Sequence, residues 1–348
     1  MTAGSAPRVV VTWTDYDLDD PATGGRLREA GYEVVLAPKV GARTAAQVAR
    51  LVRDADAAIV STDPFDRPVF AAARRLRVIA RVGVGTDSID LAAATAAGVV
   101  VTTTPGANRE TAADHAVAMI LAATRRIVEH DAAVRRGEWR RTGAAAPWDL
   151  HDATVGIVGY GAIGRAVARR LAGFGTRLLI ADPALAAGHD GRGGAPAAGG
   201  AAGAGGPVRF GVVELDELLA RADVVSLPLP LLAGTRGIIG AGALRAMRPG
   251  ALLVNTSRGA LVDEAALLDA LRAGRIRGAA LDVFADEPHV PAALRALPNV
   301  VLTPHVGGLS VRSIARMTRR ATADVLAVLA GDRPDSVVNP EALAQVAV

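Results

Sequence analysis

Short apolar runs alternate with stretches of helical periodicity along most of the chain. In the first third we expect five strands, at 8–13, 33–37, 57–61, 78–82 and 99–103. The helical patterns between them lie at 22–30, 45–53, 68–75 and 90–97. Strands that alternate with helices in this way predict an α/β domain with a parallel sheet.

A second alternating unit begins at residue 154 and continues to about residue 303. Its expected strands are 154–158, 177–181, 223–227, 251–255, 278–281 and 299–302. Its expected helices are 162–173, 214–221, 242–246 and 263–272. Longer helical patterns at 109–127 and 311–330 flank this unit. A chain of 348 residues, 51% of them hydrophobic, supplies enough apolar material for about two domains.

Two segments lack either pattern. Residues 128–152 are polar, and they predict either an arm over a neighbouring subunit or an ordinary surface connection, which the residues alone do not separate. Residues 186–207 are mostly Gly and Ala. A phosphate-binding loop needs a strand before it and a helix N-terminus after it, and this run has neither. We therefore expect a flexible surface insertion there.

Composition excludes several classes of function. The 39 basic residues, of which only Lys39 is a lysine, are mixed with 35 acidic ones, so we expect no nucleic-acid partner. The absence of cysteine excludes disulfides and cysteine-based zinc sites, and we expect no metal. No run approaches the roughly 18 apolar residues of a membrane helix, and residues 1–7 do not read as a signal peptide. The expectation is a cytoplasmic protein with no membrane partner.

The strand pattern at 154–158 runs directly into the turn GYGAIG at 159–164, which opens a helical segment. In a nucleotide-binding turn, Gly159 permits the tight bend, Gly161 lets the backbone approach a pyrophosphate, and Gly164 allows the helix to pack on the strand. The helix N-terminus offers its N–H groups to the phosphates. The alternative is a turn of the same shape that binds nothing.

Asp182 ends the next strand pattern, about 20 residues after the turn begins. A carboxylate at that place accepts hydrogen bonds from the adenosine ribose hydroxyls and repels a 2′-phosphate. Because Pro183 rather than an arginine follows, the sequence favours NAD over NADP as the cofactor.

Three polar residues follow predicted strands of the second unit: Arg258, Glu287 and His305. The carboxyl ends of parallel strands face the ligand crevice, so these side chains are expected to meet beside the nicotinamide. Histidine suits proton transfer near neutral pH, a carboxylate fixes its tautomer, and arginine grips a carboxylate. The set predicts a 2-hydroxy or 2-keto acid substrate, although each residue taken singly also has an ordinary structural explanation.

These motifs together resemble the D-isomer-specific 2-hydroxyacid dehydrogenase family, which includes the phosphoglycerate dehydrogenases. The motifs that carry the resemblance are RVGVG at 81–85, TPGAN at 104–108, GYGAIG with Asp182, NTSRG at 255–259, LDVFADEP at 281–288 and PHVGG at 304–308. The resemblance implies two Rossmann-like α/β domains. A split flavodoxin-like substrate domain would comprise 1–108 and 305–348, and a doubly wound NAD-binding domain would be inserted at 109–304. It also implies a homodimer joined through the nucleotide domain, which supports the arm interpretation of 128–152.

The resemblance also implies roles for individual residues. The catalytic residues would be Arg258, Glu287 and His305, with His305 as the acid/base and Glu287 as its partner. Besides Gly159, Gly161, Gly164 and Asp182, the residues implied to bind NAD are Ala162, Ile163, Leu229, Pro230, Thr256, Ser257, Asp282, Gly307 and Gly308. Asp282 would face the nicotinamide carboxamide. The residues implied to lie near the substrate are Arg81, Val84, Gly85 and Asn108.

The resemblance leaves the substrate and even the class of function open. Ser61 and Thr62 stand where phosphoglycerate dehydrogenases often carry an arginine near the substrate phosphate, although Arg81 could still serve. Phosphoglycerate, glyoxylate or hydroxypyruvate, and a specialised biosynthetic acid all remain candidates. A second hypothesis is an NAD-sensing corepressor of the C-terminal-binding-protein type, but the intact Arg–Glu–His set favours an NAD-dependent dehydrogenase.

Overall fold

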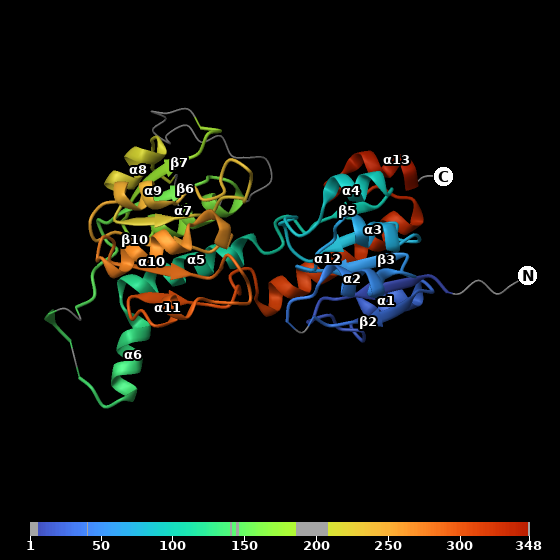
Figure 1. Ribbon diagram of the computed structural model, residues 1–348, viewed down its shortest axis with the longest axis horizontal. Helices are drawn as coiled ribbons and strands as arrows, with labels where there is room; N and C mark the ends of the chain where they lie inside the picture. The colour runs from blue at the N-terminus through green and yellow to red at the C-terminus, as the bar shows by residue number, and fades with distance from the viewer. Residues whose placement is uncertain (1–5, 40, 140, 144–145, 186–207, 347–348) are drawn as a thin grey trace, which may run out of the picture. The chain divides into compact units, whose positions relative to one another are not determined.

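The computed structural model describes residues 6–39, 41–139, 141–143, 146–185 and 208–346. The chain forms two compact units (Figure 1). One, here called the terminal unit, consists of Met1–Asn108 and Leu309–Val348, and the other, the central unit, is Arg109–Gly308. The expected insertion at 186–207 lies outside the described residues.

The terminal unit is built on a five-stranded parallel sheet with the order β2-β1-β3-β4-β5. The strands are β1 (Arg8–Val11), β2 (Glu33–Leu36), β3 (Ala57–Val60), β4 (Val78–Arg81) and β5 (Val100–Thr102). This is the flavodoxin-like order. Three strands, β3, β4 and β5, are buried along their whole length, as their continuous apolar runs predict for a sheet covered on both faces.

Helices cover both faces of this sheet. They are α1 (Gly24–Glu29), α2 (Ala45–Val52), α3 (Arg67–Ala72), α4 (Leu91–Ala96), α12 (Val311–Ala330), η3 (Pro340–Ala342) and α13 (Leu343–Val346). Residues of α2, α3 and α4 form the core on one face. On the other face, Leu27 of α1 packs in one core with Met317, Val325 and Val328 of α12. The C-terminal segment therefore covers one face of a sheet whose strands all come from the first part of the chain.

The central unit has a seven-stranded parallel sheet with the order β12-β11-β10-β9-β6-β7-β8. The strands are β6 (Thr154–Val158), β7 (Arg177–Ala181), β8 (Gly211–Val212), β9 (Val224–Ser226), β10 (Leu252–Asn255), β11 (Gly278–Leu281) and β12 (Val300–Leu302). The order reverses between β6 and β9, which is the doubly wound arrangement whose ligand crevice lies beyond the strand ends at the reversal. The predicted fold class, two Rossmann-like α/β domains, is confirmed.

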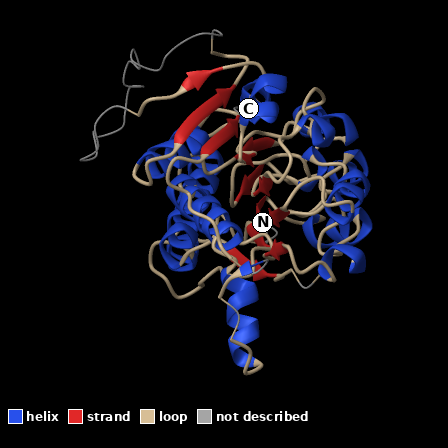
Figure 2. Cartoon of the chain, turned by 90° about the vertical axis from the view of Figure 1, so that its left-hand side faces the viewer, coloured by secondary structure: helices blue, strands red, loops and turns tan. Residues whose placement is uncertain are grey.

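Helices flank the strands on either side (Figure 2). They are α5 (Arg109–Thr124), α6 (Ile127–Arg135), α7 (Ala162–Ala172), α8 (Leu215–Arg221), α9 (Ala241–Ala246), η2 (Gly259–Leu261), α10 (Glu264–Arg272) and α11 (Ala292–Arg295). Residues of α5 and α7 form the core on one face of the sheet, and residues of α8, α9 and α10 form the core on the other. Within the described part of the chain, no helix is both long and apolar enough to cross a membrane.

The structure divides one expected helix in two. The pattern at 109–127 predicted a single helix, but α5 ends at Thr124 because Arg126 adopts a left-handed conformation with φ of 52°. A new helix, α6, begins at Ile127 and occupies the first part of the segment that lacked periodicity. Its large apolar side chains, Ile127, Val128 and Val134, are exposed rather than facing a core, so no amphipathic pattern marked it.

The chain returns from the central unit to the terminal unit later in the sequence than expected. Contacts place this return after Gly308, not after residue 304. The backbone N–H groups of His305, Val306 and Gly307 all donate to Asp282, at 2.8, 3.0 and 2.8 Å. These bonds hold the histidine segment to the end of β11, so it belongs to the central unit.

Candidate active site

The glycine turn at 159–164 is shaped by contacts that leave no room for side chains at two of its glycines. Gly159 has φ of 95°, and a Cβ there would lie 2.8 Å from the Cβ of Leu229. A Cβ at Gly164 would lie 2.2 Å from the carbonyl oxygen of Gly159. Gly161 is the N-cap of α7, and a Cβ placed there would have no atom within 4 Å. No side chain caps this helix. The open position and the uncapped helix N-terminus suit an approaching phosphate.

Asp182 is tied to this turn. It follows β7, which pairs with β6 so that Ala181 lies opposite Val158. One carboxylate oxygen accepts from the Tyr160 N–H at 2.5 Å, and the other accepts from the Ala184 N–H at 2.9 Å. A carboxylate has about four acceptor positions, so capacity remains for ribose hydroxyls. The glycines, the helix N-terminus and the acid therefore fit a dinucleotide.

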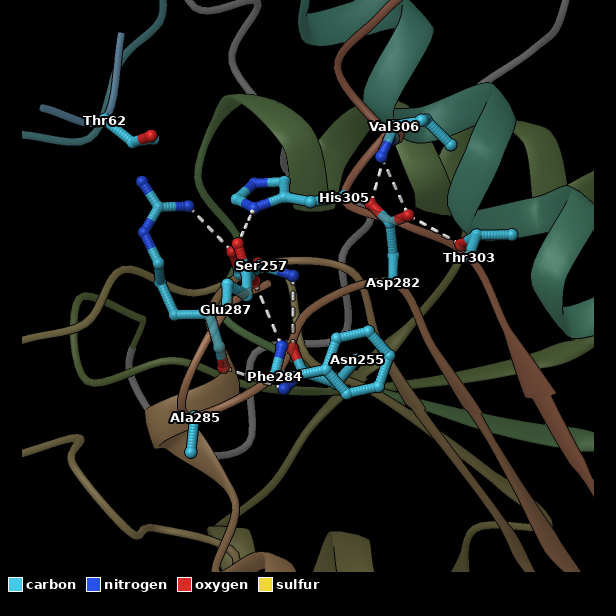
Figure 3. A network of polar contacts seen from close by, with 12 residues as sticks. Thr62, Asn255, Ser257, Asp282, Phe284, Ala285, Glu287, Thr303, His305 and Val306 are labelled. Atoms are coloured by element: carbon cyan, nitrogen blue, oxygen red, sulfur yellow. Dashed lines mark hydrogen bonds and ion pairs between the residues drawn. The ribbon is translucent and has the colours of Figure 1, made fainter. Parts of the chain in front are cut away.

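His305 and Glu287 form a hydrogen-bonded pair in the loops that follow β12 and β11. Nδ1 of His305 lies 2.6 Å from Oε2 of Glu287, and the side chains are 35% and 31% exposed (Figure 3). Burial raises the pKa of Glu287, but the hydrogen bond and charge of His305, the Phe284 N–H and the charge of Arg258 outweigh it and lower that pKa below its usual value. Glu287 is therefore an ionised acceptor that directs Nδ1, which leaves Nε2 as the ring atom for proton exchange.

Arg258 lies in the loop that follows β10. Asn255 shapes this loop: its Oδ1 accepts from the Ser257 N–H at 3.1 Å, and its Nδ2 donates to the Arg258 carbonyl at 2.8 Å. Gly259 allows close contact with the loop after β11, because a Cβ there would lie 2.0 Å from the carbonyl carbon of Phe284. The structure thus gathers the three predicted residues, Arg258, Glu287 and His305, at one edge of the central sheet.

Asp282 is held inside the central unit by hydrogen bonds. It was implied to face the nicotinamide carboxamide, but its side chain is 0% exposed and both oxygens accept from protein donors. Burial raises the pKa of Asp282, whereas the donors His115, Thr303, Val306 and Gly307 lower it, and the net shift is downward. Asp282 therefore fixes the segment that carries His305. A direct contact with the nicotinamide stays a prediction.

The sequence analysis missed His115 and Thr303. Nε2 of His115 lies 3.3 Å from Oδ1 of Asp282 and 3.1 Å from Oγ1 of Thr303. The available signal was a histidine that interrupts the apolar stretch of the helix at 109–127. No group of three or more His, Asp or Glu side chains arranged to hold a metal occurs in the described ranges.

The remaining predicted residues lie in both units. In the central unit, Leu229 is buried against Gly159 and Pro230 is exposed after β9, while Ala162, Ile163, Thr256 and Ser257 are exposed or half-buried at the sheet edge. In the terminal unit, Val84 is exposed and Gly85 half-buried after β4, and Asn108 ends the first segment. Arg81 is 9% exposed, and its Nη1 donates to the Val82 carbonyl at 2.9 Å.

Comparison with known proteins places this site in a family. Residues 117–307 match the D-isomer specific 2-hydroxyacid dehydrogenase, NAD binding domain. The chain is 39% identical to the glyoxylate reductase of Korarchaeum cryptofilum over 340 residues, covering 96% of each protein. The chain belongs to the D-isomer specific 2-hydroxyacid dehydrogenase family. The turn at 159–164 lies within the matched NAD binding domain, so the dinucleotide that it fits is NAD.

Two further comparisons agree with this assignment. The D-3-phosphoglycerate dehydrogenase of Mycobacterium leprae is 41% identical over 289 residues, which are 83% of this chain. This chain spans about half, 52%, of that relative's length. Among solved structures, the TT0316 protein of Thermus thermophilus has a TM-score of 0.82 and 39% identity, with coverage of 95% of this chain and 99% of that one.

The charge of Asp282 generates a prediction about stability. Asp282→Asn should lower the free energy of unfolding by about 2 kcal/mol or more at pH 7, because an amide nitrogen would face N–H and O–H donors. Since the folded-state pKa is depressed, the wild-type advantage is present above the ordinary pKa of about 3.9 and is lost as the pH falls through the lower folded value.

Urea unfolding followed by circular dichroism at several pH values measures this difference. The gap between wild type and variant should be equal at neutral and mildly acidic pH and should close only below about pH 4. Asp149→Asn, whose side chain is 83% exposed, is the matched control and should leave stability unchanged. A gap that persists at strongly acidic pH would show that the charge of Asp282 is not the stabilising feature.

Proposed function

We propose that the protein is an NAD-dependent dehydrogenase that interconverts a D-2-hydroxy acid and the corresponding 2-keto acid. The observation that carries the proposal is the 2.6 Å pair of His305 and Glu287, with Arg258 in the adjoining loop, in the same unit as the nucleotide turn. An acid/base, its orienting carboxylate and a cation for a substrate carboxylate are the groups that this chemistry needs.

Bound NAD supplies the hydride acceptor, and NADH the donor, for the substrate carbon. In the oxidative direction, Nε2 of His305 takes the hydroxyl proton; in the reductive direction it returns a proton to the carbonyl oxygen. Glu287 holds Nδ1 in its protonated form and stabilises the imidazolium that results. Arg258 can grip the substrate carboxylate in a bidentate manner. The backbone N–H groups of Val84 and Gly85 are proposed to bind the substrate.

The substrate is proposed by its chemical class, a D-2-hydroxy acid or the corresponding 2-keto acid. Relatives of this chain include both a glyoxylate reductase and a D-3-phosphoglycerate dehydrogenase. Arg81 is buried and its Nη1 donates to the Val82 carbonyl, which argues against it as a phosphate ligand. Lys39, whose Nζ donates to Thr62 Oγ1 at 2.7 Å, brings a cation to the position where phosphoglycerate dehydrogenases often carry an arginine.

The test is NADH oxidation by the full chain with glyoxylate, hydroxypyruvate and phosphohydroxypyruvate. His305→Ala should lower kcat by about 10²- to 10⁴-fold while NADH binding, measured by fluorescence titration, stays nearly unchanged. His289→Ala is the matched control, because His289 is exposed in the loop just after Glu287. Turnover by His305→Ala near the wild-type rate would remove the acid/base assignment. If wild type binds NADH and turns over none of the acids, the corepressor hypothesis replaces the enzyme.

Asp182 generates a prediction about cofactor choice. Asp182→Ala removes the acceptor for the ribose hydroxyls and the repulsion of a 2′-phosphate, so the ratio of kcat/KM with NADH to that with NADPH should fall about tenfold or more. Asp149→Ala is the control for loss of an exposed negative charge in the same unit. An unchanged ratio in Asp182→Ala would exclude this role.

We also propose a homodimer that forms through α6 and the segment after it. Ile127, Val128, Val134 and Trp139 are 53%, 54%, 55% and 77% exposed. Two of these side chains, Val134 and Trp139, line a hollow of about 330 Å³ together with His130, Ala133, Glu138, Arg141 and Pro147. Large apolar side chains gathered on a surface mark an interaction site. Because residues 128–152 are interpreted as an arm over a neighbouring subunit, we propose that a second copy of this chain binds there.

Val134→Asp tests this surface by sedimentation velocity. Wild type should sediment as a dimer and the variant as a monomer, because a charge would be buried in an apolar interface. Leu232→Asp, at a side chain that is 60% exposed elsewhere in the central unit, should remain dimeric. A monomeric wild type, or a dimeric Val134→Asp, would contradict the proposal.

A further inference from the structure

The turn that carries His305 has an unusual backbone. His305 has φ of 55°, in the left-handed region that side chains other than glycine rarely adopt. Three consecutive N–H groups hold it there: that of His305 donates to the carbonyl of Asp282, and those of Val306 and Gly307 donate to the carboxylate of Asp282. The direction of the His305 side chain therefore depends on where the Asp282 carboxylate lies.

A second histidine contacts this carboxylate from another element. His115 lies on α5, and its Nε2 is 3.3 Å from Oδ1 of Asp282 and 3.1 Å from Oγ1 of Thr303. Thr303 itself donates its hydroxyl proton to Asp282 at 2.6 Å, so its oxygen is an acceptor toward His115. Both neighbours of Nε2 are thus acceptors, and Nε2 carries the proton.

His115 also closes the turn sterically. A Cβ at Gly307 would lie 3.1 Å from Cδ2 of His115 and 2.8 Å from Oδ2 of Asp282, so the imidazole ring packs directly on the Gly307 backbone. The other donors to Asp282, from Thr303, Val306 and Gly307, all belong to the segment that has to be held. His115 is the partner of Asp282 that comes from a separate helix, and it confines the segment between α5 and the end of β11.

We propose that His115 is a positioning residue for the reaction: its Nε2–H holds Asp282 and Thr303, and through them the left-handed turn that directs His305 toward Glu287. The inference rests on the proposed function for its kinetic consequence. Without His115, the oxygen of Thr303 loses its donor and the Gly307 backbone loses its packing. The turn then relaxes, and the pair of His305 and Glu287 loses its alignment.

The kinetic experiment compares His115→Ala with His115→Gln in the full chain. The alanine variant should lower kcat by about 10- to 100-fold, as small misplacements of a catalytic group do, while KM and Kd for NADH stay near wild type. Glutamine carries an amide donor close to the place of Nε2 and should recover most of the loss. His289→Ala is the control for removal of a histidine, and circular dichroism establishes that each variant is folded.

A second readout requires no turnover. In protein labelled with ¹⁵N-histidine, the ring nitrogens of His305, assigned by their loss in His305→Ala, report its tautomer and its bond to Glu287. Wild type and His115→Gln should show a single tautomer protonated at Nδ1, whereas His115→Ala should show averaged shifts. If wild type reduces no 2-keto acid but His115→Ala alone shows averaged ring shifts, the proposed function fails and the positioning role stands. Wild-type shifts in His115→Ala, or wild-type kcat in an active enzyme, would overturn the positioning role.

Discussion

The buried carboxylate of Asp282 is the interaction on which the candidate active site depends. Parallel strands bring their carboxyl ends to one edge of a sheet, but this alone leaves the loops beyond them without a fixed conformation. Asp282 supplies that conformation by accepting from the backbone of the next strand's loop, at Val306 and Gly307. A buried charge is tolerated only where donors surround it, and here the donors are the segment that must be positioned. The stability of this edge and the orientation of His305, the proposed acid/base, therefore depend on the same small group of hydrogen bonds.

The two halves of the site differ in how they are built. The nucleotide turn relies on the absence of side chains: Gly159 and Gly164 make room for backbone contacts, and Gly161 leaves an open approach. The catalytic edge relies on the presence of polar side chains that fix one another, Asn255 within its own loop and Glu287 against His305. The first arrangement suits a cofactor bound by backbone N–H groups, whereas the second fixes the orientation of His305, the proposed proton-transfer group.

Most of the fold could be predicted from periodicity, because strands buried on both faces are continuous apolar runs and the helices between them are amphipathic. The expected strands of the terminal unit all occur, and so do the glycine turn and its acid. The break at Arg126 could not be predicted, since a left-handed residue leaves no mark in hydropathy. Nor could α6, whose large apolar residues are exposed. Arg258, Glu287 and His305 were found because polar residues at strand ends are conspicuous. His115 was not, because its partner Asp282 is far away in sequence and only the fold brings them together.

The return of α12 to the sheet of the terminal unit has a consequence for synthesis of the chain. Leu27 of α1 shares its core with residues of α12, such as Met317 and Val325, that leave the ribosome only after the whole central unit has been made. The central unit is complete in one stretch of sequence, so it can fold while one face of the first sheet still lacks its cover. During that interval the uncovered apolar face is a place where chaperones can bind or nascent chains can aggregate. Translation speed across the central unit therefore sets how long this protein is exposed to misfolding.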